Sequence, residues 1–150
     1  MNGKRIAALI AVLLVAAFIW GNSMLSKSAS LQESELVRGW VAPLLKLAFG
    51  KRRISLILIR KLAHLTEFAA LGVGLGVLFA GRRRWYLRTL GLGMAAAVLD
   101  ETIQLFSDRS AELRDVGIDM LGILLGTLLC AAVLALRRRR KNKRTKAPEA

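Results

Sequence analysis

The sequence predicts an all-α membrane protein, a four-transmembrane-helix bundle with a short interfacial helix between helices 1 and 2. Two observations lead to this fold class. Hydrophobic residues make up 55% of the 150 residues, and they lie in blocks close to the roughly 20 residues that a helix needs to cross a bilayer. The 24 lysines and arginines gather mainly in clusters beside these blocks, as residues that anchor a helix at the membrane surface do.

The four predicted spans follow one another along the chain. The first covers 6–24, and an alternative for it is a cleavable signal peptide, because Lys4 and Arg5 precede it and the small residues "SKSAS" follow it. Glycines recur in the later spans, which suits close helix packing in lipid, and we assign the GxxxG pair Gly122 and Gly126 to contacts within one chain. The second, third and fourth spans cover 54–80, 85–106 and 116–136.

The segments outside the spans are polar or basic. Residues 25–35 are rich in serine and predict a loop, and residues 36–50 are amphipathic, which predicts the short interfacial helix. The transmembrane domain is therefore expected to cover 1–136. The remaining residues, 137–150, form a basic tail that we expect to be disordered and cytoplasmic.

The distribution of basic residues predicts the orientation. Leaving aside Arg60 and Lys61, fourteen lysines and arginines lie on the side that carries both termini and eight lie on the other side. The side with the larger number faces the cytoplasm. We therefore predict a multi-pass protein of the inner (plasma) membrane with both termini in the cytoplasm. Since the basic clusters adjoin apolar blocks, we attribute the net charge of +14 to contact with membrane lipids and expect no nucleic-acid partner.

Polar and ionisable side chains interrupt three of the predicted spans. The second span contains "RKLAHLTEF" (60–68), the third ends in "LDETIQLF" (99–106), and the fourth begins at "DVGID" (115–119). A charged side chain at the bilayer centre costs roughly 2.5–3.5 kcal/mol, so such residues usually have a partner or a function. Because the second and fourth spans run inward and the third runs outward, these stretches all lie toward the outer side of the membrane.

We expect these side chains to converge in a polar pocket that opens outward. Within each span they are spaced by three or four residues, which places them on one face of a helix. The alternative is a salt-bridge network that only fixes the register of the helices. The expected members are Lys61, His64, Glu67, Asp100, Glu101, Gln104, Asp115 and Asp119, with Arg60 and Arg109 close enough to join them.

Three functions are compatible with such a pocket. In a binding protein, cationic side chains would hold a phosphate or carboxylate of an envelope lipid or drug. In an enzyme, His64 would be a general base oriented by Glu67 or Asp115. Asp100 and Glu101 would then hold a divalent cation. A proton- or ion-coupled carrier is the third possibility, and the lack of an inverted repeat disfavours it.

The residues are assigned to these roles as follows. The catalytic candidates are His64, Glu67, Asp100 and Glu101. The ligand-binding candidates are Arg60, Lys61, Gln104, Arg109, Asp115 and Asp119. Outside the enzyme alternative the sequence indicates no metal site, since one His-x-x-Glu pair does not make a zinc site, and the sequence does not determine whether there is a cofactor.

The ordered set "RKLAHLTEF", "LDETIQLF" and "DRSAELRDVGIDMLGILLG" resembles the VanZ-like family of small integral membrane proteins, which is named after a teicoplanin-resistance protein. The stretch "FIWGNSMLSKSASLQES" also resembles the first loop of the family, so the resemblance covers 18–135. One departure is that Ser107 and Asp108 precede Arg109, where the family often has Pro-Gly.

The resemblance implies a binding or resistance accessory at the bacterial cell envelope, related to a lipoglycopeptide or an envelope lipid. It supplies no defined reaction. The alternative is therefore a membrane-embedded enzyme that acts on a lipid-linked or phosphate-bearing envelope substrate, with His64 as the general base.

Overall fold

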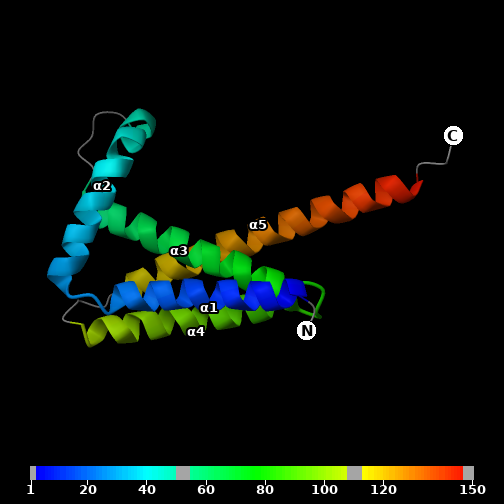
Figure 1. Cartoon of the computed structure of the whole chain (residues 1–150), viewed down its shortest axis with the longest axis horizontal. Coiled ribbons are helices and arrows are strands. Elements are labelled where there is room, and N and C mark those ends of the chain that lie inside the picture. The colour runs from blue at the N-terminus through cyan, green and yellow to red at the C-terminus, as the bar shows by residue number, and fades with distance from the viewer. Residues whose placement is uncertain (1–2, 50–54, 108–112, 147–150) are drawn as a thin grey trace.

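The computed structural model describes residues 3–49, 55–107 and 113–146, and this part of the chain is entirely helical and contains no strand (Figure 1). Its five helices are α1 (Gly3–Ser23), α2 (Lys27–Phe49), α3 (Leu56–Phe79), α4 (Trp85–Leu105) and α5 (Leu113–Lys146). The all-α prediction is confirmed for the described residues.

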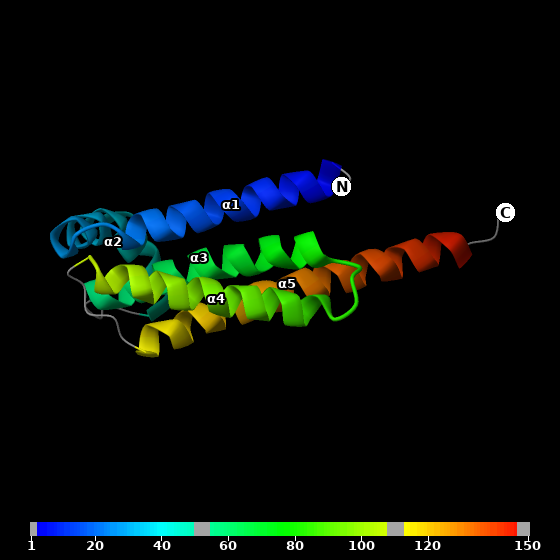
Figure 2. The same cartoon turned by 90° about the horizontal axis from the view of Figure 1, so that it is seen from below.

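Four of the helices form a bundle, and α2 lies at an angle to it (Figures 1 and 2). Helices α3 and α5 run in one direction through the bundle, and α1 and α4 run in the other. Contacts join α3 to α1, α4 and α5, so α3 is central, while α2 contacts α3. The start of α1, the α3–α4 turn and the last turns of α5 lie at one end, which we call the basic end. The opposite end, where α3 and α5 begin, we call the polar end.

Large apolar side chains cover the outside of the bundle. Leu13, Leu14, Leu128 and Leu129 are each more than half exposed. A soluble monomer rarely exposes apolar surface on this scale, whereas a helix in lipid must. Three helical segments are long and apolar enough to cross a membrane, namely Arg5–Ser23, Leu56–Phe79 and Arg114–Asn142. The chain is therefore a membrane protein.

Helix α4 is not among these three segments, although its 21 residues match the length of α1. Its second half carries Asp100, Glu101 and Gln104, which reduce its apolar character. All three are buried inside the bundle and do not face outward. That the chain crosses the membrane four times accordingly remains a prediction.

The structure differs from the sequence-based prediction between the first two spans. One 23-residue helix, α2, replaces the expected loop at 25–35 and the expected short helix at 36–50. The serine-rich stretch supports the start of this helix, because the hydroxyl of Ser26 accepts a hydrogen bond from the backbone N–H of Ala29 at 3.4 Å. Leucine, glutamine and glutamate follow, which are good helix formers. The interfacial position of α2 stays a prediction.

The tail also differs from its prediction. Helix α5 continues to Lys146, so residues 137–146 are helical where disorder was expected. Arginine and lysine are good helix formers, and positive charge near a helix C-terminus interacts favourably with the helix dipole. In Figure 1 this basic extension projects beyond the bundle.

Helices α3 and α5 approach each other closely at glycines. A Cβ atom on Gly122 would lie 2.6 Å from the carbonyl oxygen of Leu65, and one on Gly126 would collide with the carbonyl oxygen of Ala69. The backbones therefore touch, as they do where small residues line helix contacts in lipid. The assignment of this GxxxG pair to contacts within one chain is confirmed.

Candidate functional site

Polar side chains gather inside the bundle toward its polar end. Five of them are almost completely excluded from solvent: Ser23 from α1, Asp100, Glu101 and Gln104 from α4, and Asp119 from α5. Residues from α3 face this group and link it to the surface. The predicted convergence of polar residues from three helices is therefore present in the structure, and α1 contributes as well.

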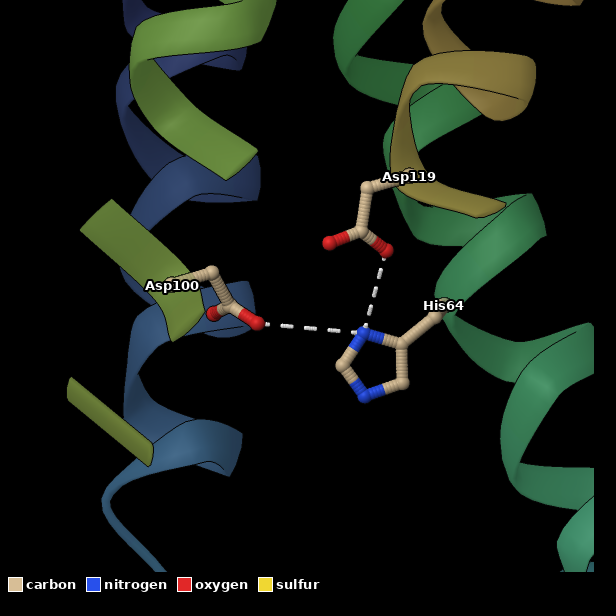
Figure 3. A group of neighbouring side chains, drawn as sticks. All are labelled: His64, Asp100 and Asp119. Carbon is tan, nitrogen blue, oxygen red and sulfur yellow. Dashed lines mark ion pairs between the residues drawn. The ribbon is translucent and has the colours of Figure 1, made fainter. Parts of the chain in front are cut away.

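His64 stands at the centre of the group, between two carboxylates (Figure 3). Its Nδ1 atom lies 3.4 Å from Oδ1 of Asp119 and 3.8 Å from Oδ2 of Asp100. The three side chains come from α3, α4 and α5, and both carboxylates are directed at the same ring nitrogen. We call His64, Asp100 and Asp119 the acidic triad.

Hydrogen bonds fix Asp100 in this position. The hydroxyl of Ser23 donates to its Oδ1 at 2.6 Å, and the amide of Gln104 donates to its Oδ2 at 2.7 Å. The Gln104 oxygen in turn accepts a hydrogen bond from Arg60 at 2.8 Å. The orientation of Asp100 is therefore determined by α1, by its own helix and by a cation on α3.

Asp119 has a different environment. It is fully buried, yet neither of its carboxylate oxygens has a hydrogen-bond partner among the described residues, and the same holds for Nδ1 of His64. Buried polar atoms are nearly always paired, and an unpaired carboxylate in an apolar bundle is costly. Nδ1 of His64 and Oδ1 of Asp119 are therefore joined by an ion pair at 3.4 Å and not by a hydrogen bond.

Two further contacts extend from the triad toward the surface. Lys61 forms an ion pair with Asp115 at 3.4 Å, and these side chains are 38% and 20% exposed. One turn after His64 on α3, Glu67 accepts a hydrogen bond from Asn22 of α1 at 3.4 Å. Glu67 and Arg60 also line a pocket of about 130 Å³ between α1, α2 and α3.

The structure corrects the expected pairings within the group. In the enzyme alternative, Glu67 or Asp115 was expected to orient His64, but Asp100 and Asp119 flank its Nδ1 atom instead. Asp100 and Glu101 were expected to hold a divalent cation together, but the carboxylate that lies beside Asp100 and His64 is Asp119. Glu101 is buried nearby. Arg109 lies outside the described residues.

Sequence reasoning missed three contributors to the site. Ser23 and Asn22 end the first span, where "GNS" reads as an ordinary polar helix end, and Glu33 enters the pocket from α2. Hydroxyl and amide groups at a helix end give little signal by themselves. Only the packing of α1 against α3 and α4 reveals what these groups contact.

Comparison with known proteins yields one match. The model of the VanZ/LLP1 family matches residues 6–135, a range that contains every residue of the acidic triad and of the pocket. No curated protein and no solved structure matches the chain.

Proposed function

Because this chain belongs to the VanZ/LLP1 family, we propose that it is a multi-pass protein of the bacterial plasma membrane that binds the polar head of an envelope lipid or a lipoglycopeptide. The binding site lies on the outer side of the membrane, and binding is how the protein acts as a resistance accessory.

The directions of the helices support four crossings. Helices α3 and α5 run the same way and are both apolar enough to span a bilayer. The chain must therefore return across the membrane between them, and α4 is the helix that connects them. The polar residues of α4 are tolerated because they face the bundle and not the lipid.

The charge distribution supports the orientation. Arg82, Arg83 and Arg84 follow α3 at the basic end, and the arginine-rich extension of α5 leaves the bundle at that same end. Accumulated basic residues are retained in the cytoplasm. The polar end, with the acidic triad and the pocket, then faces outward.

The observation that carries the proposal is the pocket between α1, α2 and α3. Arg60 and Glu67 line it from α3 and Glu33 from α2, and apolar Phe18 and Ile59 line it too. An arginine suits a phosphate or carboxylate, and the glutamates suit an amine. Polar and apolar linings side by side fit an amphiphile, whose charged head and hydrocarbon part need different surroundings. Envelope lipids and lipoglycopeptides both have this character.

The pocket is connected to the acidic triad through side chains. Arg60 lines the pocket and donates to Gln104, which donates to Asp100. A ligand that draws the Arg60 guanidinium away changes the hydrogen bonding of Gln104. This chain of hydrogen bonds gives the pocket a route of contact to Asp100, in which the bond from the Gln104 amide to Asp100 does not itself require Arg60.

The test is teicoplanin susceptibility of a bacterial host that expresses the full chain. We expect Arg60→Gln and Glu67→Gln to reach the membrane at normal levels and to lose protection. Arg88→Gln is the control, because Arg88 is exposed near the basic end of α4. Native mass spectrometry of the purified protein with teicoplanin or with extracted lipids then identifies the ligand. Full protection by both pocket variants would contradict the proposal.

The orientation has its own test. Cys130 is the only cysteine and is buried, so Cys130→Ala gives a background for single-cysteine labelling. In intact cells a membrane-impermeant maleimide should label Ser28→Cys and leave Asn142→Cys unlabelled. The opposite pattern would move the polar end to the cytoplasm.

An enzyme acting on a lipid-linked substrate is the second candidate, and the geometry of His64 favours it. Two carboxylates face Nδ1 of His64, so Nε2 is the ring nitrogen that could accept a proton from a substrate. Mass spectrometry of lipid-linked envelope intermediates tests this candidate. An enzyme would change their composition in a way that His64→Gln abolishes, whereas a binding protein would leave them unchanged.

A further inference from the structure

We propose that His64, Asp100 and Asp119 bind one divalent transition-metal ion, of the zinc or manganese class, where α3, α4 and α5 meet (Figure 3). This inference goes beyond the proposed function, because it concerns the buried acidic triad and not the ligand pocket. It can be measured on the purified protein without any envelope ligand.

The spacing of the three side chains suits a shared metal ion. Each offers one ligand atom, and these atoms all lie within 4.8 Å of one another. Nitrogen and oxygen ligands about 2.0–2.2 Å from a tetrahedral zinc ion lie about 3.4 Å apart. The separations from Nδ1 of His64 are 3.4 Å and 3.8 Å, and the two carboxylates lie within 4.8 Å of each other, so Asp100 must move toward both other ligands to complete the arrangement.

The same separations argue against a direct hydrogen bond as the reason for the cluster. A protonated histidine donates to a carboxylate at about 2.7–2.9 Å, which is shorter than either separation here. The side chains point at one another at ion-pair separations, which are longer than a charge-assisted hydrogen bond and suit ligands that share a cation. A metal ion between them accounts for both facts.

Asp119 provides the second, independent observation. It is 0% exposed, it is directed into the triad, and both of its oxygens lack hydrogen-bond partners among the described residues. Two buried carboxylates, Asp100 and Asp119, bring two negative charges, of which His64 can balance only one. A divalent cation balances both, and charges inside a membrane bundle need such compensation.

The surroundings of Asp100 resemble the outer shell of a metal site. Ser23 and Gln104 hold its carboxylate, as hydrogen bonds commonly orient metal ligands. An imidazole combined with two carboxylates favours Zn²⁺ or Mn²⁺ over Mg²⁺ and Ca²⁺, which prefer oxygen ligands alone. Three protein ligands also leave a coordination position open for water or a ligand oxygen.

The test is metal binding by the full-length protein in detergent, after treatment with a chelator. Calorimetric titration with Zn²⁺ and with Mn²⁺ should show one site per chain. His64→Ala and Asp119→Asn should abolish it, whereas Ser23→Ala and Gln104→Ala should weaken it by about 10–100-fold. Asp115→Asn is the matched control, because Asp115 lies one turn away on α5 and pairs with Lys61. It should bind metal as the unmodified protein does.

A second measurement needs no variant. Pulsed electron paramagnetic resonance of bound Mn²⁺ should detect one imidazole nitrogen, which must belong to His64, the only histidine. Two results would overturn the proposal: no stoichiometric binding of either metal by the unmodified protein, or unchanged affinity in Asp119→Asn. Metal binding that persists in Arg60→Gln while protection is lost would separate this site from the ligand pocket.

Discussion

The contact between α3 and α5 is built in two different ways along its length. Toward the basic end, Gly126 lies against the backbone of Ala69 and Gly76 lies against Cys130, so the helices touch through small residues. Toward the polar end, His64 faces Asp119 and Lys61 faces Asp115. The two parts of one interface thus use opposite chemistry.

The difference teaches which part determines the distance between the helices. Lipid provides no hydrophobic force between apolar helices, so close packing at glycines must hold the pair together. Gly122, which lies against the backbone at Leu65, is less than one turn from Asp119. The glycine contacts therefore fix the spacing at which His64 and Asp119 face each other. We expect changes at the glycines to affect mainly folding. Changes at the polar residues should affect function, and they should also lower stability where a buried partner or a bound metal is lost.

The largest effect is expected for Gly126→Leu. A side chain there collides with the backbone of Ala69, so α3 and α5 must separate. The loss of unfolding free energy should reach about 3 kcal/mol, the upper part of the range for overpacking. Circular dichroism during titration with a denaturing detergent measures it. Gly117→Leu, on the same helix with open space around it, is the control. Equal stability of the two variants would show that the glycine contact is not what holds the helices.

The second effect is the loss of stability when the proposed metal ion is removed from the acidic triad, in the polar part of the α3–α5 contact. A ligand present at 100 times its dissociation constant stabilises the folded state by about 2.7 kcal/mol. Chelation should therefore lower the melting temperature of the unmodified protein measurably. It should not change that of Asp119→Asn, which lacks a metal ligand. If the chelator lowered the melting temperature of both proteins equally, its effect would not come from removal of a metal ion from the acidic triad.

The third effect is smaller and tests the hydrogen bond that crosses from α1. Ser23→Ala removes the donor to Asp100 and leaves a buried carboxylate oxygen unpaired, while Gln104 still holds the other oxygen. We therefore expect a cost in the lower part of the range of about 1–3 kcal/mol. Ser28→Ala is the control, because its hydroxyl is exposed at the start of α2. Detergent unfolding of both variants measures the difference. If Ser23→Ala were as stable as the control, α1 would not support the site.

The sequence was sufficient to predict the all-helical fold and the convergence of polar residues, because depth and helical spacing can be read from it. It could not predict the pairings. Asp115 and Asp119 lie on the same face of α5, one turn apart, so the position of α5 along its axis relative to α3 decides which of them His64 meets. The close approach of the backbones at Gly122 and Gly126 is part of the packing that sets this position. The length of α2 was underestimated because the serines at 26–30 suggested a loop, although the hydroxyl of Ser26 supports the start of the helix.

The smallest effect distinguishes the pairing in the structure from the pairing suggested by the sequence. Lys61 is bound to Asp115 in a partly exposed ion pair, so a double-mutant cycle of Lys61→Met with Asp115→Asn should give a coupling of about 0.2–1 kcal/mol. The cycle of Lys61→Met with Asp119→Asn should give none, because Asp119 faces His64 instead. Both cycles use the same detergent unfolding measurement and share one single variant, so each controls the other. Coupling confined to the Asp119 cycle would mean that α5 is shifted by about one turn along its axis from the position described here, and Asp119 would then not belong to the acidic triad.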